Sequence, residues 1–355
     1  MTTKTKTTWR TVRLGNVMTT PHPFLSKVKT SEYKKSGSIP IYDQGSLVTV
    51  GFTDDPKAKY RGSLPAILFG DHTLTLNLIE HPFAFGADGI QLLEPDTSLF
   101  DKTFFFYALK SLKIKSYGYE RHLKYLREAE VPIGPIDEQK RIAEILSAFD
   151  EKIENNDRII KTLEEMAQAI FKKRFAVPAE TLSKGWEVKN VLEVVKRIPV
   201  GKKYENKSAL PTGKVPILDQ GQSGCIGYHN DEPGVVASVD EPVVIFTNHT
   251  CNYRLVTYPF STIQNVLPYV GINGYPTLFV YYLTRGKITM QEYKGHWPDF
   301  EKQEFLVPPM ALAKEFASFI KPMVQKMVET ENENQKLAAM RDLLLPRLMS
   351  GEIQV

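Results

Sequence analysis

The chain carries the stretch IPIYDQG at residues 39–45 and a near copy of it, VPILDQG, at residues 215–221. Further blocks return in the same order: Trp9 as Trp186, GFTDD (51–55) as GYHND (227–231), and PAILFGDHT (65–73) as PVVIFTNHT (242–250). The offset is 176 residues for IPIYDQG and 177 for PAILFGDHT. Such an offset indicates that one domain was duplicated together with its connector, and it differs from an array of 20–50-residue repeats.

Composition sets broad limits on the protein. The 355 residues are enough for two or three domains with cores of their own. Lys and Arg total 45 against 41 Asp and Glu, a net charge of +4 that permits nucleic-acid binding without indicating it. We expect no signal peptide or membrane-spanning helix, a cytoplasmic location, and reduced thiols at Cys225 and Cys251.

Short strand-forming runs broken by Gly, Pro, Asn and Asp fill residues 9–133 and return from Trp186 to about Val307. We predict strands at 39–42, 47–50 and 66–69, and a helix within 99–112. The predicted fold class is therefore α+β, with two duplicated mixed α/β domains.

Each of these blocks is followed by a heptad pattern, in which seam residues recur at alternating spacings of four and three. The first seam is Ile142, Leu146, Phe149, Ile153, Asn156, Ile160 and Leu163; the second is Phe316, Ile320, Met323, Met327, Thr330, Asn334 and Leu337. We expect two long coiled-coil helices that run antiparallel in a pseudo-twofold arrangement, which divides the chain at 1–134, 135–177, 178–307 and 308–355. Pro322 predicts a bend or a late start of the second helix. The polar seam residues are interpreted as a register device or as a contact with a partner helix.

The sequence lacks the usual catalytic motifs. It has no phosphate-binding Gly-x-x-x-x-Gly-Lys-Ser/Thr loop, no Gly-x-Gly-x-x-Gly, and no Asn/Asp-Pro-Pro-Tyr of amino-methyltransferases. PDFEK at residues 298–302 resembles a nuclease metal site only superficially, because its carboxylates are too close together. His72 and His249 recur without a cysteine, metal set or serine elbow beside them, so we interpret them as polar residues at strand ends. The pattern favours binding over catalysis, with no catalytic residue and no metal.

A family resemblance rests on VPIGPIDEQKRIAEIL at 131–146 and LLPRLMSGEI at 344–353. These stretches resemble the DNA-specificity (S) subunit of type I restriction–modification systems, although residues 309–316 lack the Glu-Gln of the first copy. The resemblance implies two target-recognition domains that each read one half of a split, asymmetric DNA site, with the helices setting the gap. It also implies two methyltransferase (M) subunits and two restriction (R) subunits as partners. No cofactor is expected on this chain; S-adenosylmethionine and ATP are expected only on the partners.

Candidate DNA contacts are basic and aromatic residues before each helix. In the first half they are Lys113, Lys115, Tyr119, Arg121, His122 and Lys124; in the second they are Arg285, Lys287, Lys294, His296 and Trp297. Gly118 is matched to Gly295 at an offset of 177. Further candidates are Lys27, Lys29, Lys34, Lys35, Lys202, Lys203 and Tyr204. Such residues suit phosphates and base edges, but the same pattern is also typical of solvated loops.

Residues that are identical in the two halves are poor candidates for reading two different sequences. We therefore predict a structural turn at each Asp-Gln-Gly, and look for specificity in divergent stretches such as 123–127 and 300–304.

Three alternatives remain beside the restriction–modification subunit: the specificity subunit of a methylation-only system, a stand-alone DNA-modifying enzyme, and a protein-interaction scaffold. A methylation assay on the lone chain tests the enzyme, and salt-dependent DNA binding by the complex tests the scaffold.

Overall fold

The computed structural model describes residues 9–21, 27–45, 49–86, 89–114, 121–176, 185–221, 224–290, 292 and 294–355. The chain divides into two compact units. Unit 1 comprises Met1–Glu154 and Asn334–Val355, and unit 2 comprises Asn155–Glu333. Domain 1 denotes here the part of unit 1 up to Ile133, and domain 2 the part of unit 2 from residue 185 to Val307.

Domain 1 is built from short strands that are followed by two helices. Its elements, with the helix that follows them, are β1 (Arg10–Arg13), α1 (Leu14–Val17), β2 (Met18–Thr19), η1 (Thr30–Glu32), β3 (Ile39–Tyr42), β4 (Gly51–Thr53), β5 (Ala66–Gly70), β6 (Leu76–Ile79), β7 (Ala84–Phe85), β8 (Ile90–Pro95), α2 (Lys102–Lys110), α3 (Leu123–Glu128), β9 (Glu130–Ile133) and α4 (Ile136–Phe175). The strands pair in the orders β2-β8-β5-β6, β4-β3-β7 and β1-β9. Strand β5 is buried along its whole length, as its apolar sequence requires.

Domain 2 repeats this order. Its elements, with the helix that follows, are β10 (Glu187–Asn190), η3 (Val191–Glu193), β11 (Val195–Arg197), η4 (Asn206–Ser208), β12 (Val215–Leu218), β13 (Cys225–His229), β14 (Val243–Thr247), β15 (Tyr253–Val256), β16 (Ser261–Thr262), β17 (Val266–Gly271), α5 (Thr277–Thr284), α6 (Trp297–Glu301), β18 (Glu304–Val307) and α7 (Met310–Met349). The sheet orders β11-β17-β14-β15, β13-β12-β16 and β10-β18 match those of domain 1. The predicted α+β class with two duplicated domains is confirmed.

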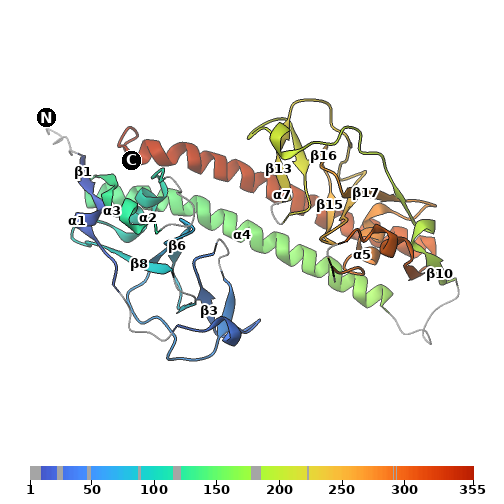
Figure 1. Ribbon diagram of the computed structural model, residues 1–355, viewed down its shortest axis with the longest axis horizontal. Helices are drawn as coiled ribbons and strands as arrows, with labels where there is room; N and C mark the ends of the chain where they lie inside the picture. The colour runs from blue at the N-terminus through green and yellow to red at the C-terminus, as the bar shows by residue number, and fades with distance from the viewer. Residues whose placement is uncertain are drawn as a thin grey trace. The chain divides into compact units, whose positions relative to one another are not determined.

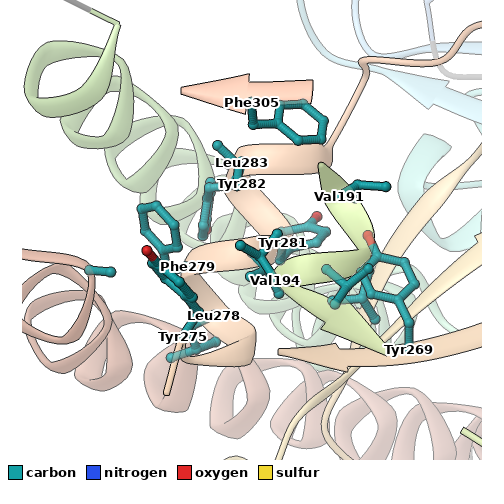
Figure 2. Packing of buried hydrophobic residues seen from close by; sticks show 14 of the residues in the cluster. Val191, Val194, Tyr269, Tyr275, Leu278, Phe279, Tyr281, Tyr282, Leu283 and Phe305 are labelled. Carbon is teal, nitrogen blue, oxygen red and sulfur yellow. The ribbon is translucent and has the colours of Figure 1, made fainter. Parts of the chain in front are cut away.

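The core of domain 2 surrounds α5, whose residues from Leu278 to Thr284 are all buried. A helix that is apolar on every side must be covered on every side. Figure 2 shows how this is done: side chains of α5 point toward Val191 and Val194 on one part of the chain and toward Phe305 on another. Helix α2 has the same place in domain 1, where residues 104–109 are buried.

The expected helices differ slightly from the observed ones. Helix α4 carries Asp137 and Glu138 in its first turn and three basic residues in its last, so its charges complement the helix dipole. Helix α7 begins at Met310 and runs through Pro322, so a late start at this proline is wrong. The reason is that the buried face continues across it, from Phe316 to Val324. The predicted strand at 47–50 is also displaced: 46–48 lie outside the described residues, and β4 begins only at Gly51.

Within each unit the two helix segments run antiparallel. In unit 1, Asp150 forms an ion pair with Arg341, and Nε of Arg141 donates to the carbonyl of Val355 at 2.7 Å. In unit 2, Arg174 pairs with Glu315 at 3.0 Å, as Asn156 does with Glu333 at 2.9 Å. In both units, residue numbers rise along α4 as they fall along α7.

The seam residues lie inside this pairing. Each of the fourteen is buried or half-buried, and the polar Asn156 and Thr330 are 1% and 2% exposed. Figure 1 shows the end of α7 returning to the part of unit 1 that holds β1. There Leu345, Leu348 and Met349 join the core that contains Ile142.

Cys225 and Cys251 are free thiols. Among the helices that the structure describes, none is both long enough and apolar enough to cross a membrane.

Candidate nucleic-acid interface

Three segments of each domain meet beside the end of one buried strand. In domain 1 they are residues 43–45, 71–75 and 121–124; in domain 2 they are residues 219–221, 248–252 and 294–297. We call each of these meeting places a loop junction. The middle segment is the turn that follows β5 or β14, and it holds the other two.

In the loop junction of domain 1, the turn binds both neighbours through its polar groups. The hydroxyls of Thr73 and Thr75 donate to the carbonyl of Gln44, the latter at 3.0 Å. The carbonyl of Asp71 accepts the N–H of His122 at 2.9 Å, and its carboxylate accepts the N–H of Leu123 at 2.8 Å. A short acceptor side chain at a turn is suited to capping the backbone of a neighbouring segment.

The loop junction of domain 2 uses the same bonds. Thr250 donates to the carbonyl of Gln220 at 3.0 Å. The carbonyl of Asn248 accepts the N–H of His296 at 2.8 Å, and its side-chain oxygen accepts the N–H of Trp297 at 2.8 Å. Asn248 thus replaces Asp71 without loss of either bond, because both side chains present an oxygen acceptor at the same distance from the backbone.

The turns themselves are held in an unusual backbone conformation. Leu74 and Cys251, at matching positions, have φ of 59° and 53°. Non-glycine residues in this left-handed region are destabilised by about 1–2 kcal/mol. Their N–H groups donate to the carbonyls of Gly70 and Thr247, at 2.8 and 2.9 Å, and this closes the turn. The strain is therefore balanced locally, and both turns hold their threonines in the same orientation.

The predicted match of Gly118 with Gly295 is wrong in register. The anchored histidines, His122 and His296, are 174 residues apart, so Gly295 matches Arg121. Domain 1 has three more residues than domain 2 between the turn and its histidine, which is why an offset of 177 fails here. Gly118 itself lies outside the described residues.

Four predicted DNA contacts are buried and serve the domain interior instead. His122 is fully buried, with Nδ1 2.9 Å from the carbonyl of Asp71. His296 is buried between the Glu292 carbonyl and Asp299, at 3.0 and 3.2 Å. Trp297 lies in the core and donates to Glu301. Tyr204 is buried and donates to Asp231 at 2.8 Å. Their aromatic surface and polar atoms are used within the protein, so we remove these residues from the contact set.

The other described candidates are exposed. They are Lys27, Lys29, Lys34, Lys35, Lys113, Arg121, Lys124, Lys202, Lys203, Arg285, Lys287 and Lys294. Lys115 and Tyr119 lie outside the described residues. The loop junctions bring together only part of this set: Arg121 and Lys124 in domain 1, and Lys294 in domain 2.

Several exposed cations already have carboxylate partners. Lys34 pairs with Asp54 at 2.9 Å, and together with hydrogen bonds from Ser38 it lowers the pKa of Asp54 to about 2. Lys202 pairs with Asp231 at 2.9 Å. Lys294 lies 2.9 Å from Glu292 and 3.6 Å from Asp299. These partners reduce the positive potential that each lysine offers to a phosphate.

Arg285 has a different environment. It forms an ion pair with Glu164 of α4 and stacks on the ring of Tyr281, 5.4 Å from its centroid. Burial lowers its pKa. Tyr282 also donates to Glu164, at 3.3 Å, so this corner fastens domain 2 to the helix segment of its own unit. Arg285 is thereby assigned to domain attachment.

Lys110 and Tyr107 make the comparable attachment in unit 1. Both contact Asp150 of α4, at 3.4 and 2.8 Å. Burial favours a raised pKa for Asp150, but Lys110, Arg341 and Tyr107 outweigh it and hold the pKa below its usual value.

Sequence reasoning missed the residues that build the loop junctions. Asp71, Thr73 and Gln44, with their counterparts Asn248, Thr250 and Gln220, carry the bonds described above. The signal was present, because these residues lie within the best-matching blocks of the duplication. Their interpretation as structural was sound for the turn, but the place where the turns converge could not be read from it.

The arrangement is suited to binding. Exposed guanidinium and ammonium groups can contact phosphates, and Arg can also read guanine edges. Within the described residues, no cluster of three or more His, Cys, Asp or Glu side chains is arranged to hold a metal ion.

Comparison with known proteins shows a consistent likeness. Residues 6–165 match the family described as type I restriction modification DNA specificity domain. The chain is 25% identical over 270 residues to the type I restriction enzyme MjaIX specificity subunit of Methanocaldococcus jannaschii, covering 65% of this chain and 62% of that protein. It thus spans less than two thirds of that relative. It is 23% identical over 363 residues to the putative MjaX specificity subunit of the same organism, covering 87% and 84%.

The fold is also similar to that of a solved protein. A type I restriction–modification S subunit from M. genitalium superposes with a TM-score of 0.59 at 18% sequence identity, and the match covers 98% of each chain. At this identity the likeness shows the fold.

Proposed function

We propose, from the premise that residues 6–165 belong to the type I restriction modification DNA specificity domain family, that the whole chain is a DNA-reading specificity subunit. The observation that carries the proposal beyond the matched residues is the pair of loop junctions. Both are assembled by the same hydrogen bonds, yet they expose different side chains, such as Arg121 in domain 1 and Gly295 at the matching place in domain 2. A duplicated frame with divergent exposed groups is suited to reading two different half-sites.

In this proposal each domain reads one half of a split, asymmetric DNA site. The positions expected to contact DNA in domain 1 are Arg121 and Lys124, with Lys27, Lys29, Lys35 and Lys113 as additional phosphate contacts. In domain 2 they are Lys287, Lys294 and Lys203. Phosphate contacts position the protein on the duplex, and contacts to base edges carry the specificity.

The partners would supply the chemistry. Two methyltransferase subunits that carry S-adenosylmethionine would modify an adenine in each half-site, and two restriction subunits would bring ATP-driven cleavage. This chain would contribute sequence recognition and the surfaces on which the partners assemble. The exposed apolar side chains of unit 2's helix segments, Ile159, Met166 and Phe319, support such a role, because large apolar groups on a surface favour association.

The decisive experiment is co-expression with the cognate methyltransferase subunit and mapping of methylated adenines. A bipartite motif is expected. Exchange of residues 9–133 for the corresponding domain of a relative should change one half of that motif and leave the other intact. A chain that directs no sequence-specific methylation, or an exchange that alters both halves in a folded complex, would contradict the proposal.

The role of the helices as a spacer has its own test. Inserting seven residues beside Ile153 in α4 and beside Met327 in α7 keeps the heptad pattern of both helices. The gap between half-sites should lengthen while each half-sequence stays the same. An unchanged gap would exclude the spacer role.

A further inference from the structure

The hairpin loop between β12 and β13 is held by a single side chain from a neighbouring strand. Arg254 of β15 donates from Nη1 to the carbonyl of Gly224 at 2.7 Å and from Nη2 to the carbonyl of Asp219. One planar guanidinium thus binds both ends of the loop, which residues with a single donor cannot do in the same way. The backbone bond from Asp219 to Gly224, at 3.2 Å, closes the same ring.

The first residues of this loop belong to the loop junction of domain 2. The side-chain oxygen of Gln220 accepts the N–H of His249 at 3.0 Å, and its carbonyl accepts the hydroxyl of Thr250. The loop is therefore fixed on one side by the turn after β14 and on the other by Arg254. It is a preformed element at the place where we propose that DNA is read.

Domain 1 lacks this device. Arg254 lies opposite Ile245 in the β14–β15 pair, and the matching β5–β6 pair places Asn77 opposite Leu68. The Asp-Gln-Gly of both loops and the threonine bonds to them are shared, so the frame of the loop is common to the two domains. The guanidinium fork belongs to domain 2 alone among these two positions.

We propose that Arg254 is a positioning residue for DNA recognition by domain 2: it holds residues 219–224 in one shape, so that the loop meets base edges without first being ordered. The inference rests on the proposed function and deepens it by assigning a recognition element to one domain. Preorganisation of a binding loop raises affinity and discrimination because the cost of ordering is met during folding.

Gly224 gives an independent way to displace the guanidinium. Its φ is +73°, and a Cβ built on it would overlap Nη1 of Arg254. Gly224→Ala therefore disturbs the contact while Arg254 remains in the chain. Arg254→Lys keeps the positive charge but removes the two-pronged donor. Asn77→Ala is the matched control in domain 1.

The test uses the complete complex with its methyltransferase subunits. Methylated motifs are mapped for each variant, and binding to cognate and single-base-variant duplexes is measured across a salt series. The half-site of domain 2 is the one that survives exchange of domain 1. We expect Arg254→Ala and Gly224→Ala to relax that half-site at one or more bases and to weaken cognate binding by about tenfold. Arg254→Lys should relax the same positions, Asn77→Ala should leave both half-sites unchanged, and the salt slope should stay constant.

Other outcomes overturn the inference. If Arg254→Ala lowers the salt slope by about one and Arg254→Lys restores it, Arg254 is itself a phosphate contact. If the variants melt at lower temperature but keep the full motif, the guanidinium only stabilises the domain. A wild-type complex that fails to methylate a bipartite site would instead refute the proposed function, whatever the variants do.

Discussion

The two domains are attached to their following helices by different means. In unit 1, Gln139 is fully buried at the start of α4, where its Oε1 accepts the N–H of Asp101 at 2.9 Å. Its Nε2 donates to the carbonyls of Leu99 and Gly134, at 2.9 and 2.8 Å. At the matching place in unit 2, Ala313 is equally buried but lies within an apolar cluster. One attachment is a hydrogen-bonded clamp, and the other is close packing.

The sheets show the same divergence. Val28, Thr53 and Ala84 of domain 1 correspond by strand register to Tyr204, His229 and Ser261 of domain 2. The second set forms a buried chain, in which the Tyr204 ring stacks on His229 at 4.1 Å and Nε2 of His229 lies 2.9 Å from Ser261.

The comparison teaches which features of the duplication are constrained. Backbone order and the loop-junction bonds are shared, whereas the buried contacts behind them are either polar or apolar. Packing tolerates such exchange when volume and pattern are kept, but each polar group needs its partner. The polar sites should therefore be the sensitive ones, and the following variants test this from the largest expected effect to the smallest.

The largest effect is expected at the clamp. Gln139→Ala removes three hydrogen bonds and leaves buried backbone groups of Leu99, Asp101 and Gly134 without their partner. The expected loss of stability of the attachment is about 3 kcal/mol. Hydrogen exchange in α2 and the first turns of α4 measures it locally. Ala313→Gly is the control in unit 2, with a loss of about 1 kcal/mol from helix propensity. Equal losses at the two sites would break the contrast.

A second contrast concerns DNA. Domain 1 exposes Arg121 where domain 2 has Gly295. In the proposed function, Arg121→Ala should weaken cognate binding by about 1–3 kcal/mol and relax one base of one half-site, as expected for a guanidinium that reads a guanine. Single-base-variant duplexes bound by the complex measure this. Unaltered specificity would return Arg121 to the solvated surface.

Much of the architecture followed from the sequence because duplication and heptad spacing are long-range patterns. IPIYDQG and VPILDQG marked β3 and β12, and the alternation of four and three marked α4 and α7. Pattern also worked for Phe104–Leu109, whose apolar run predicted a buried helix. These features depend on many residues at once, so one unusual residue such as Pro322 does not erase them.

The candidate site was harder, since exposure depends on where the chain folds back. His122, His296, Trp297 and Tyr204 have the chemistry of DNA contacts, but tertiary bonds draw them inward. The sequence also suggested a common loop register, which a difference of three residues removes. Arg254 was missed because a lone arginine on a strand carries no local signal; its role comes from two carbonyls about 30 and 35 residues away.

The pH dependence of the two domains should differ modestly. Nδ1 of His229 accepts the N–H of Asp231 at 3.1 Å, so the neutral ring donates from Nε2 to Ser261. Burial lowers the pKa of His229; Asp231 opposes this and Lys202 adds to it. Its folded pKa is below 6.5, so the stability it contributes is complete above pH 6.5 and is lost as the pH falls through the folded value.

The variant that isolates this effect places the residue of domain 1 in domain 2. His229→Thr should remove the acid-induced loss in β12 and β13, an effect of about 1 kcal/mol for one buried hydrogen bond. Hydrogen exchange between pH 7.5 and 5 compares the variant with the wild type, and β3 and β4 serve as the internal reference. Identical pH profiles for the two proteins would show that His229 is not the titrating group.

The smallest effect separates two lysines of the loop junctions. Lys124 lies 4.6 Å over the ring of Tyr125, whereas Lys294 is held between Glu292 and Asp299. A phosphate that binds Lys294 must compete with those carboxylates, and fewer counterions are released when it does so. We expect Lys124→Ala to lower the salt slope of DNA binding by about one and Lys294→Ala to lower it by less. Binding of the complex to one duplex across a salt series measures both, and Glu292→Gln should raise the contribution of Lys294. Equal slopes for the two alanine variants would mean that the carboxylates turn away from Lys294 when DNA binds, and that the two loop junctions offer the same charge despite their different neighbours.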